Sequence, residues 1–397
     1  MTELAKQHLI DPELCIRCHT CEEACPVGAI THDDVNVVVD ASMCNFCMNC
    51  IAPCPTGSID NWRVVAEPYS LAAQLGWTEL PVQQSFDAQD GVGAAVEALD
   101  EAVAALLAQA HAGAGGAARA PASASRPSVN LYKSATPAVA VVQGNYRLTA
   151  SGADSDVRHI ILDLGAQPFP ALEGQSVGVI APGADAAGRP HGMRLYSLSS
   201  PRDGERPNTN NLSLTVKRVP GGVCSEYLCD LAKGDRVALT GPFGSTFLMP
   251  DDSRANLIMI CTGTGSAPFR GFTMRRQRSL AFESGGMTLF FGARSPDSLP
   301  YFGPIGKVPE SLLRRHFAFS RAPGEEKHYV QDLMRAEKAR LAEALTREET
   351  HIYVCGLKAM EAGVEQAFED IARGAGLEWK AIRDAMRDSG RYHVETY

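Results

Sequence analysis

The sequence of 397 residues lacks several features that would assign it to a membrane or to the secretory pathway. It contains no run of about 18 apolar residues, so we expect no membrane-spanning helix. Residues 1–8 combine neither the basic region nor the apolar core of a secretory signal. An excess of basic residues is also missing, because the net charge is −9. This charge argues against nucleic acid or an anionic membrane as the main partner. Because a secretory signal and a membrane span are both missing, we expect a cytoplasmic protein.

Eight of the twelve cysteines lie in two copies of one spacing, C-x2-C-x2-C-x3-C-P. The copies are Cys15, Cys18, Cys21 and Cys25 before Pro26, and Cys44, Cys47, Cys50 and Cys54 before Pro55. This spacing is typical of bacterial-type ferredoxins, in which the fourth cysteine of each run ligates the other cluster. We therefore predict two [4Fe–4S] clusters. Their predicted ligands are Cys15, Cys18, Cys21 and Cys54 for the first, and Cys44, Cys47, Cys50 and Cys25 for the second.

Two zinc sites and a disulfide framework are the alternatives for these cysteines. Zinc ligands usually come as CxxC pairs separated by a longer loop, and disulfide scaffolds suit small secreted domains. Neither describes four cysteines within eleven residues, twice, in a chain of this length. The other four cysteines are far apart, and we expect free thiols of a reducing cytoplasm. They are Cys224, Cys229, Cys261 and Cys355.

Residues 1–65 are predicted to form an α+β dicluster ferredoxin domain with short strands at 35–39 and 60–65. Three basic side chains stand against nine acidic ones in this segment. Such an acidic surface suits docking on a basic partner, but it is equally the composition of an ordinary solvated face.

Residues 66–130 change in character. An alanine-rich helical pattern at 92–110 precedes a tract of alanine, glycine, proline and serine at 112–127. Because this tract offers little apolar surface to bury, we predict a flexible linker. It is either a tether that lets the cluster domain move or a passive spacer.

Residues 131–250 and 251–397 have the patterns of two further fold classes. Alternating strands at 138–142, 159–164, 212–219 and 236–239 predict a small antiparallel β-barrel. Strands at 256–261, 287–292, 316–320 and 351–355 alternate with helical patterns ending at 278 and spanning 332–346 and 359–375. The second set predicts an α/β domain with an open parallel sheet.

From residue 131 onward the sequence resembles the plant-type ferredoxin–NADP reductases. The motifs that carry this resemblance are Arg194-Leu-Tyr-Ser197, Gly221-Gly-Val-Cys-Ser225, Gly241-Pro-Phe-Gly244, Gly263-Thr-Gly-Ser-Ala-Pro268 and Cys355-Gly356. The resemblance implies that the barrel binds FAD and that the α/β domain binds NADPH. It also implies that Arg194 contacts the FAD pyrophosphate, Tyr196 packs on the isoalloxazine and Ser197 lies beside flavin N5. Further FAD contacts are expected from Lys217, Gly221, Gly222, Val223, Cys224 and Ser225.

The same resemblance implies a nicotinamide nucleotide site in the α/β domain. Its pyrophosphate and nicotinamide contacts are expected at Thr264, Gly265, Pro268, Arg294 and Gly356. The adenosine 2′-phosphate is expected at Ser320, Arg321, Lys327 and Tyr329. Cations there favour NADPH over NADH, because an NAD site would carry an acidic residue for the ribose 2′-hydroxyl. In the family, a cysteine lines the hydride-transfer position, and a tyrosine supported by a glutamate stacks on the flavin. The resemblance therefore implies catalytic roles for Cys355, for Tyr397 with Glu395, and for Ser197.

These parts imply an NADPH-oxidising flavin and iron–sulfur reductase that passes single electrons to an external acceptor. The fused order, dicluster ferredoxin and then plant-type reductase, resembles the reductase components of aerobic benzoyl-CoA oxygenases (benzoyl-CoA 2,3-epoxidase component A). That resemblance implies a diiron epoxidase as the acceptor, in aromatic degradation. A general NADPH–ferredoxin oxidoreductase and a redox sensor without turnover are the alternatives.

Overall fold

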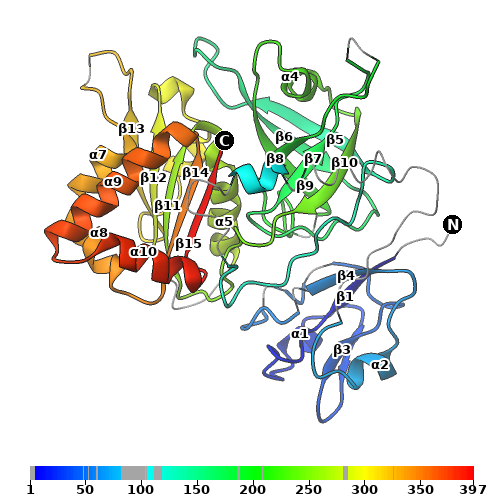
Figure 1. Cartoon of the computed structure of the whole chain (residues 1–397). Helices are drawn as coiled ribbons and strands as arrows, with labels where there is room; N and C mark the ends of the chain where they lie inside the picture. The colour runs from blue at the N-terminus through cyan, green and yellow to red at the C-terminus, as the bar shows by residue number, and fades with distance from the viewer. Residues whose placement is uncertain are drawn as a thin grey trace.

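Three folded domains follow one another along the chain (Figure 1). The computed structural model describes residues 5–47, 49–51, 53–59, 61–81, 103, 105–110, 119–185, 188–207, 209–279, 285–324 and 326–397. We call residues 5–81 the cluster domain, the strands from 138 to 243 the barrel, and residues 251–397 the α/β domain. Figure 1 shows the cluster domain below the barrel, and the α/β domain beside the barrel.

The cluster domain has the repeated layout of short strands and helices expected from its two cysteine motifs. Strands β1 (Ala5–Leu9) and β4 (Asn61–Val65) pair antiparallel, and β2 (Ile30–His32) pairs antiparallel with β3 (Val37–Val39). Two short helices, α1 (Thr20–Glu23) and α2 (Leu71–Leu75), complete it. Strands β3 and β4 confirm the two strands predicted for this segment; residue 60 lies outside the described residues.

Residues 66–81, which composition placed after the cluster domain, pack against it. The Asn36 amide donates to the carbonyls of Leu75 (3.0 Å) and Trp77 (2.7 Å). Gln74 exchanges hydrogen bonds with the backbone of Val39. These contacts join α2 to β3 through groups that are far apart in the sequence, which explains why local composition does not reveal them.

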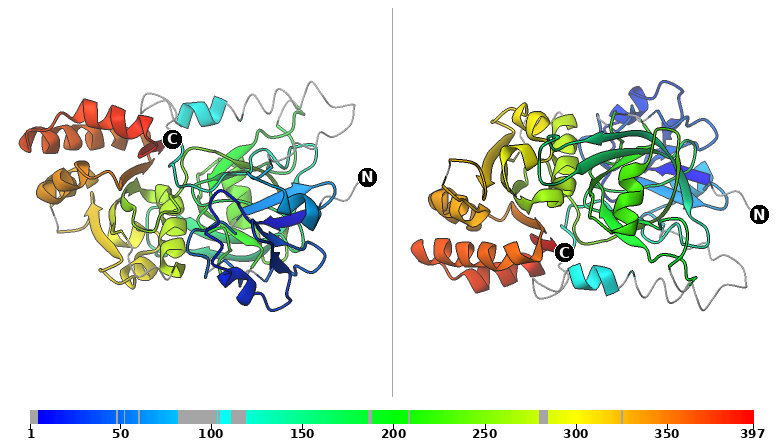
Figure 2. Two further views of the ribbon diagram at one scale, coloured as in Figure 1. Left: turned by 90° about the horizontal axis from the view of Figure 1, so that it is seen from below. Right: turned by 90° about the horizontal axis from the view of Figure 1, so that it is seen from above.

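Part of the predicted linker makes fixed contacts. Residues 105–110 are helical, and Val103 and Leu107 pack on Met193 and Phe243 of the barrel. The remainder of the expected helix, and residues 112–118, lie outside the described residues. In both views of Figure 2 this helical stretch, in cyan, lies near the C-terminal end of the chain.

Residues 119–130, which we call the docked segment, also contradict the expectation of a flexible linker. The Ser123 carbonyl accepts from the Asp251 N–H (3.3 Å), and the buried Ser125 hydroxyl donates to the Asp251 carboxylate. Arg202 donates to the Ser125 hydroxyl as well (2.8 Å). Serine in a low-complexity tract carries no sign of such partners, because Arg202 and Asp251 are 77 and 126 residues away.

The barrel is a six-stranded antiparallel sheet in the order β8-β7-β10-β5-β6-β9. A bridge between Leu198 and Leu214 joins its first and last strands and closes it. Apolar side chains from alternate positions fill the interior, as the period of the sequence predicted. The elements are β5 (Ala138–Arg147), β6 (Val157–Asp163), β7 (Ser176–Val179), β8 (Arg194–Ser197), β9 (Asn211–Lys217), α4 (Val223–Asp230) and β10 (Arg236–Phe243).

The α/β domain is a five-stranded sheet in the order β13-β12-β11-β14-β15, with every neighbouring pair parallel. Hydrophobic clusters cover both faces, as the continuously apolar strands predicted. The strands are β11 (Asn256–Thr262), β12 (Met287–Ala293), β13 (Leu313–Phe319), β14 (Thr350–Gly356) and β15 (Tyr392–Thr396). The helices are the 3₁₀ turns η2 (Gly263–Gly265) and η3 (Pro296–Ser298), α5 (Ser266–Arg278), α6 (Phe302–Gly306), α7 (Val330–Ala336), α8 (Lys338–Leu345), α9 (Lys358–Gly374) and α10 (Trp379–Asp388).

One predicted helix is wrong as a single element. The pattern over 332–346 forms two helices, α7 and α8, which meet at Glu337. The Glu337 N–H bonds to the carbonyls of Leu333 and Met334 and ends α7. The buried Met334 and Leu341 then pack on the same sheet face from two separate helices.

A buried polar network joins the barrel to the α/β domain. Arg270 of α5 donates to both carboxylate oxygens of Glu205 (2.7 and 2.8 Å), and Arg278 donates to Asp203 (2.5 Å). The Tyr301 hydroxyl hydrogen-bonds Thr215 (2.6 Å). Burial alone would raise the pKa of Glu205, but hydrogen bonds from His159 and Arg270 hold it well below its ordinary value. The two domains are therefore connected by paired, desolvated charges.

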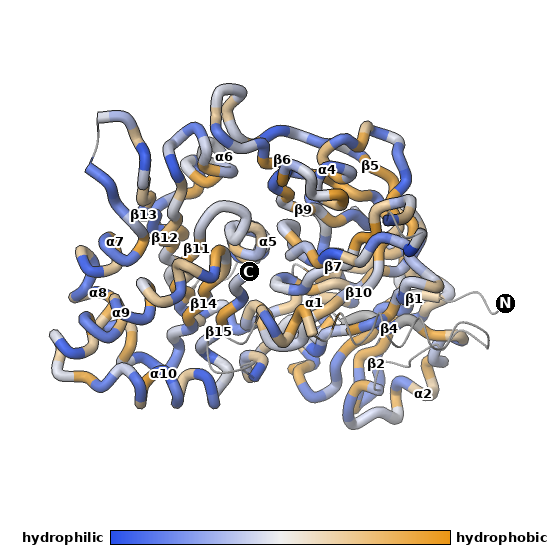
Figure 3. Tube along the Cα trace, turned by 45° about the horizontal axis from the view of Figure 1, so that its top comes forward, coloured by the Kyte–Doolittle hydropathy of each residue, from blue (hydrophilic) through white to orange (hydrophobic). Residues whose placement is uncertain are grey.

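The hydropathy of the chain differs between the strands and the outward sides of the helices. Figure 3 shows hydrophobic residues along the central strands and hydrophilic residues on the outward sides of the α/β-domain helices. Among the residues that the structure describes, no helix combines the length and apolar character needed to cross a bilayer.

Candidate functional site

The motif cysteines lie in the cluster domain, where Cys25 lies with the second motif and Cys54 lies near cysteines of the first. Cys25 of the first motif lies with the first three cysteines of the second, around one small cavity whose apolar walls include Ile30 and Val39. That cavity is lined by Cys25, Cys44, Cys47 and Cys50.

The other four cysteines lie around the first motif loop. The Cys21 thiol is close enough to Cys15 and Cys54 to be affected electrostatically by both. Cys18 is exposed, and its sulfur lies 3.2 Å from the Thr20 hydroxyl, which donates to the carbonyl of Pro53. The loop bearing Cys18 thus lies beside the residue that precedes Cys54.

The electrostatics of these thiols fit a positively charged group. Burial, together with repulsion from Cys54 and Cys15, raises the pKa of Cys21 to about 11. Cys54 differs: burial opposes its ionisation, but hydrogen bonds from Ser58 and from the backbone N–H of Ile59 lower its pKa. Thiols that repel one another as anions need a counter-charge, and the iron of a cluster would supply it.

In the barrel, the Arg-Leu-Tyr-Ser motif forms strand β8. This strand pairs with β7 on one side and meets β9 on the other through the Leu198–Leu214 bridge. The exposed Arg194 donates to the carbonyl of Met193 (3.0 Å), and Tyr196 packs partly on the barrel core. Ser197, half-buried, pairs with Ser176 of β7. Arg194 and Tyr196 alternate with Leu195 along the strand, so both lie on the same face.

The N-terminus of α4 lies against this strand. The buried Cys224 contacts the carbonyl of Val179, whose strand partner is Arg194, and Cys224 also interacts with Tyr196. A Cβ on Gly222 would meet the Ser225 hydroxyl at 2.7 Å, so glycine is needed for this close turn. The neighbouring candidates are Gly221 and Val223, and Lys217 is exposed at the end of β9.

The glycine loop of the α/β domain follows β11 and starts α5, the context that a pyrophosphate loop requires. Thr264 and Gly265 form η2, and the buried Pro268 lies in the first turn of α5. A Cβ on Gly265 would overlap the carbonyl of Cys355, so only glycine lets this loop approach the end of β14. Gly356 follows there with a φ of +138°. Turn η2 also contacts β9, which brings this loop to the barrel.

Tyr397 and Glu395 lie at the same edge of the sheet. The Tyr397 hydroxyl hydrogen-bonds the Thr264 hydroxyl (2.7 Å), and the Tyr397 N–H donates to the Gly356 carbonyl (3.0 Å). Glu395 pairs with Cys355 across β15 and β14, and burial raises its pKa to about 8. The structure therefore brings together the predicted residues at the ends of β11, β14 and β15.

The candidate 2′-phosphate residues lie around the ends of β12 and β13. Ser320 and the exposed Arg321 follow β13, and the Arg321 N–H donates to the carbonyl of Arg294, at the end of β12 (2.7 Å). The Lys327 ammonium lies 4.9 Å from the centre of the Tyr329 ring. The two pairs are close, because the His328 N–H donates to the carbonyl of Phe319.

Three domain families match the chain in the order of its folded domains. The 4Fe-4S binding domain matches residues 8–31, the oxidoreductase FAD-binding domain matches 154–247, and the oxidoreductase NAD-binding domain matches 259–366.

Curated relatives cover the barrel and the α/β domain together. The cyanelle ferredoxin–NADP reductase of Cyanophora paradoxa is 38% identical over 287 residues, which are 68% of this chain and 79% of that protein. The ferredoxin–NADP reductase of Synechocystis sp. is 37% identical, over 68% of this chain and 70% of that protein. The chain belongs to the ferredoxin–NADP reductase family. Its architecture and activity follow: it is an NADP-dependent oxidoreductase with an FAD-binding antiparallel sheet, a parallel-sheet NADP domain and an N-terminal 4Fe-4S ferredoxin region.

Solved ferredoxin–NADP reductases share this fold. The enzyme from Plasmodium falciparum superposes with a TM-score of 0.55 at 25% identity, over 68% of this chain and 99% of that chain. A second structure of that enzyme, with 2'P-AMP, superposes with a TM-score of 0.54 at 25% identity and the same coverage.

Sequence reasoning missed contacts that position the reductase residues. The Thr264–Tyr397 hydrogen bond joins residues 133 positions apart, and Arg270–Glu205 joins residues 65 apart. No local motif signals either pair. The one signal available was the arginine content of α5, which includes Arg270.

Proposed function

We propose that the chain is an NADPH-oxidising reductase that passes electrons singly, through FAD and two [4Fe–4S] clusters, to an external acceptor. The acceptor proposed is the diiron epoxidase component of an aerobic benzoyl-CoA oxygenase. The observation that carries the proposal is the presence, in one chain, of a reductase of the ferredoxin–NADP type and a cluster domain with eight grouped cysteines. The fused order supports the particular acceptor through its resemblance to benzoyl-CoA oxygenase reductases.

The residues present fit both nucleotide cofactors. FAD, when bound, takes up a hydride and supplies single electrons; Arg194 and the N-terminus of α4 would hold its pyrophosphate. Tyr196 would cover the flat ring and Ser197 would lie at the reacting edge, with Cys355, Glu395 and Tyr397 facing them from the α/β domain. Arg321, Lys327 and Tyr329 would bind the 2′-phosphate of NADPH, a group that 2'P-AMP carries in the related structure.

The two cysteine groups fit two cubane clusters. Cys25 lies among cysteines of the second motif, and Cys54 lies beside those of the first. None of the twelve cysteines, all of which the structure describes, forms a disulfide, and this supports a reducing, cytoplasmic location.

The experiment separates the reductase from its clusters. A chain that begins at Val103 keeps the helical stretch and the docked segment, so we expect it to bind FAD and reduce ferricyanide with NADPH at nearly the full rate. It should fail to support the epoxidase component. The full-length Cys47→Ala variant should fail in the same way, which controls for the loss of the domain as such.

Two outcomes would contradict the proposal. If the shortened chain drives the epoxidase as well as the full chain does, the clusters serve another purpose. If full-length protein reduces an unrelated ferredoxin as fast as it supports the epoxidase, the chain is a general NADPH–ferredoxin oxidoreductase, the function that the names of its relatives favour.

A further inference from the structure

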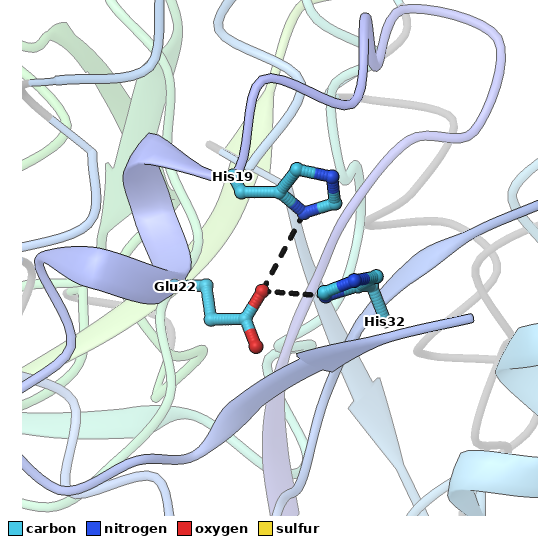
Figure 4. Close-up of side chains that lie close together, drawn as sticks. All are labelled: His19, Glu22 and His32. Carbon is cyan, nitrogen blue, oxygen red and sulfur yellow. Dashed lines mark hydrogen bonds and ion pairs between the residues drawn. The ribbon is translucent and has the colours of Figure 1, made fainter. Parts of the chain in front are cut away.

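We infer that the cluster domain holds a third metal site, for a zinc ion, at His19, Glu22 and His32 (Figure 4). The site uses none of the eight motif cysteines, and it stands independently of the acceptor proposed above. The two imidazoles face the same carboxylate from different elements: His19 precedes α1, Glu22 lies within it, and His32 ends β2.

The donor atoms of these residues are close together. Oε2 of Glu22 lies 2.7 Å from Nδ1 of His32 and 3.5 Å from Nδ1 of His19. One donor atom from each residue lies within 4.8 Å of the other two. The imidazole ring centres are 4.0 Å apart. A tetrahedral zinc ion with ligands at about 2.0–2.2 Å needs donors separated by about 3.3 Å, so small side-chain rotations suffice.

The backbone sets up the position of His19. Its φ of 58° is in the left-handed region, which costs a residue with a side chain of order 1 kcal/mol. This conformation precedes α1 and places His19 one helical turn from Glu22. Residue 32 comes from a different part of the chain, on β2, so the three-residue arrangement depends on the fold of the domain.

Hydrogen bonding alone leaves one donor of this group unsatisfied. His32 and Glu22 satisfy each other at 2.7 Å, whereas Nδ1 of His19, shielded from solvent, reaches the same carboxylate oxygen only at 3.5 Å and forms no good hydrogen bond with a described residue. A cation between the three side chains would bind this nitrogen together with the other two donors.

The donor set selects the class of metal. Two imidazole nitrogens and one carboxylate oxygen suit zinc and its transition-metal neighbours, whereas Mg²⁺ and Ca²⁺ prefer oxygen ligands alone. The three side chains keep 30–43% of their surface exposed, so a bound ion could complete its coordination with water.

The experiment uses the tag-free, full-length protein with its clusters in place, under anaerobic conditions. The protein is dialysed against micromolar ZnCl₂, and zinc, iron and sulfide are measured in the same sample. We expect one zinc per chain with no loss of iron, and none retained from MgCl₂. Glu22→Gln should weaken zinc binding at least about tenfold, the effect typical of losing one metal-site partner.

A matched control distinguishes this site from nonspecific zinc binding by acidic side chains of the domain. Glu23→Gln removes the same charge from the next position of α1, where the side chain is exposed, and it should bind zinc like the wild type. His32→Asn tests the site from β2, away from the cysteine loop, should Glu22→Gln disturb cluster assembly. The inference is overturned if the wild type retains no zinc, or if a fully iron-loaded His32→Asn protein binds zinc as tightly as the Glu23→Gln control.

Discussion

The junction between the barrel and the α/β domain contains buried ion pairs, whereas the junction with the cluster domain contains an exposed one. Between the barrel and the α/β domain, Arg270 and Arg278 are mostly buried and bind Glu205 and Asp203. Between the cluster domain and the rest, Arg126 of the docked segment binds Glu13 at 3.1 Å, and both side chains are about half exposed. Desolvated pairs are costly to break, whereas exposed pairs contribute about 0–1 kcal/mol. The buried pairs therefore hold the two reductase domains together more strongly than the Arg126–Glu13 pair holds the cluster domain.

The largest effect is expected from breaking the buried junction. Arg270→Ala leaves the Glu205 carboxylate desolvated and without its main partner, at a cost of about 3 kcal/mol. The thermal midpoint of flavin release should fall by about 6–12 °C. Arg254→Ala, at an exposed pair with Asp252, is the control and should change it little. Equal midpoints for the two variants would refute the importance of the network.

The second prediction tests whether the α/β domain alone determines the preference for NADPH over NADH. Arg321→Ala removes an exposed cation whose charge-assisted contact with the 2′-phosphate should contribute about 1.5–3 kcal/mol. The KM for NADPH should rise about ten- to a hundredfold, with NADH kinetics unchanged. Lys307→Ala, an exposed cation elsewhere in the α/β domain, should alter neither KM. A similar loss with both nucleotides would mean that Arg321 has a structural role.

The third prediction concerns Glu395, a carboxyl group that the α/β domain buries. Burial raises the pKa of Glu395 to about 8 from an ordinary 4.5, so between these pH values the folded chain binds more protons than the unfolded chain. Stability should therefore decrease as pH rises through this window. From pH 6 to pH 8 the loss should be about 2 kcal/mol in the wild type and absent in Glu395→Gln.

Thermal midpoints measured across this pH range, as differences between wild type and variant, isolate the contribution of Glu395 from that of the histidines. Glu310→Gln, at an exposed carboxylate, is the control and should follow the wild type. A Glu395→Gln protein that keeps the full pH dependence would show that the residue is ionised in the folded state.

The smallest effect is expected at the exposed junction. Arg126→Glu should leave the thermal midpoint unchanged but increase the radius of gyration, because Glu13 then repels the docked segment. The wild type should expand similarly at 1 M salt, where the Debye length is about 3 Å. Adding Glu13→Arg should restore the compact form at low salt. A radius that ignores both charge and salt would mean that other contacts hold the cluster domain.

Sequence reasoning succeeded where the determinant is local. The cysteine spacing predicted that Cys25 would lie with Cys44, Cys47 and Cys50, and the strand–glycine–helix order placed Thr264 and Gly265 at the sheet edge. The period of apolar residues predicted the barrel and the parallel sheet. Each of these features depends on residues close in sequence or on the spacing of apolar residues along a strand.

It failed where partners are distant. Ser125 belongs to a tract whose composition predicts flexibility, yet its hydroxyl binds Asp251, 126 residues away. Glu205 and Arg270 show no pattern that would pair them before the domains are in place. His19, Glu22 and His32 were not singled out either, because the first two lie inside a cysteine motif that already explained that stretch. His32 comes close to them only because β2 contacts α1 in the folded domain.

The packing of Val103 on the barrel limits how far the cluster domain can lie from the reductase domains, and so sets its effective concentration there. The last described contact of the cluster domain is the Pro81 carbonyl, which accepts from Arg63, and the first described contact of the chain with the barrel is at Val103. The intervening chain of about 20 residues can extend no more than about 70 Å. Within that radius one cluster domain per reductase corresponds to an effective concentration on the order of millimolar. A separate ferredoxin would have to reach about that concentration to compete with the attached cluster domain for electrons from the same reductase.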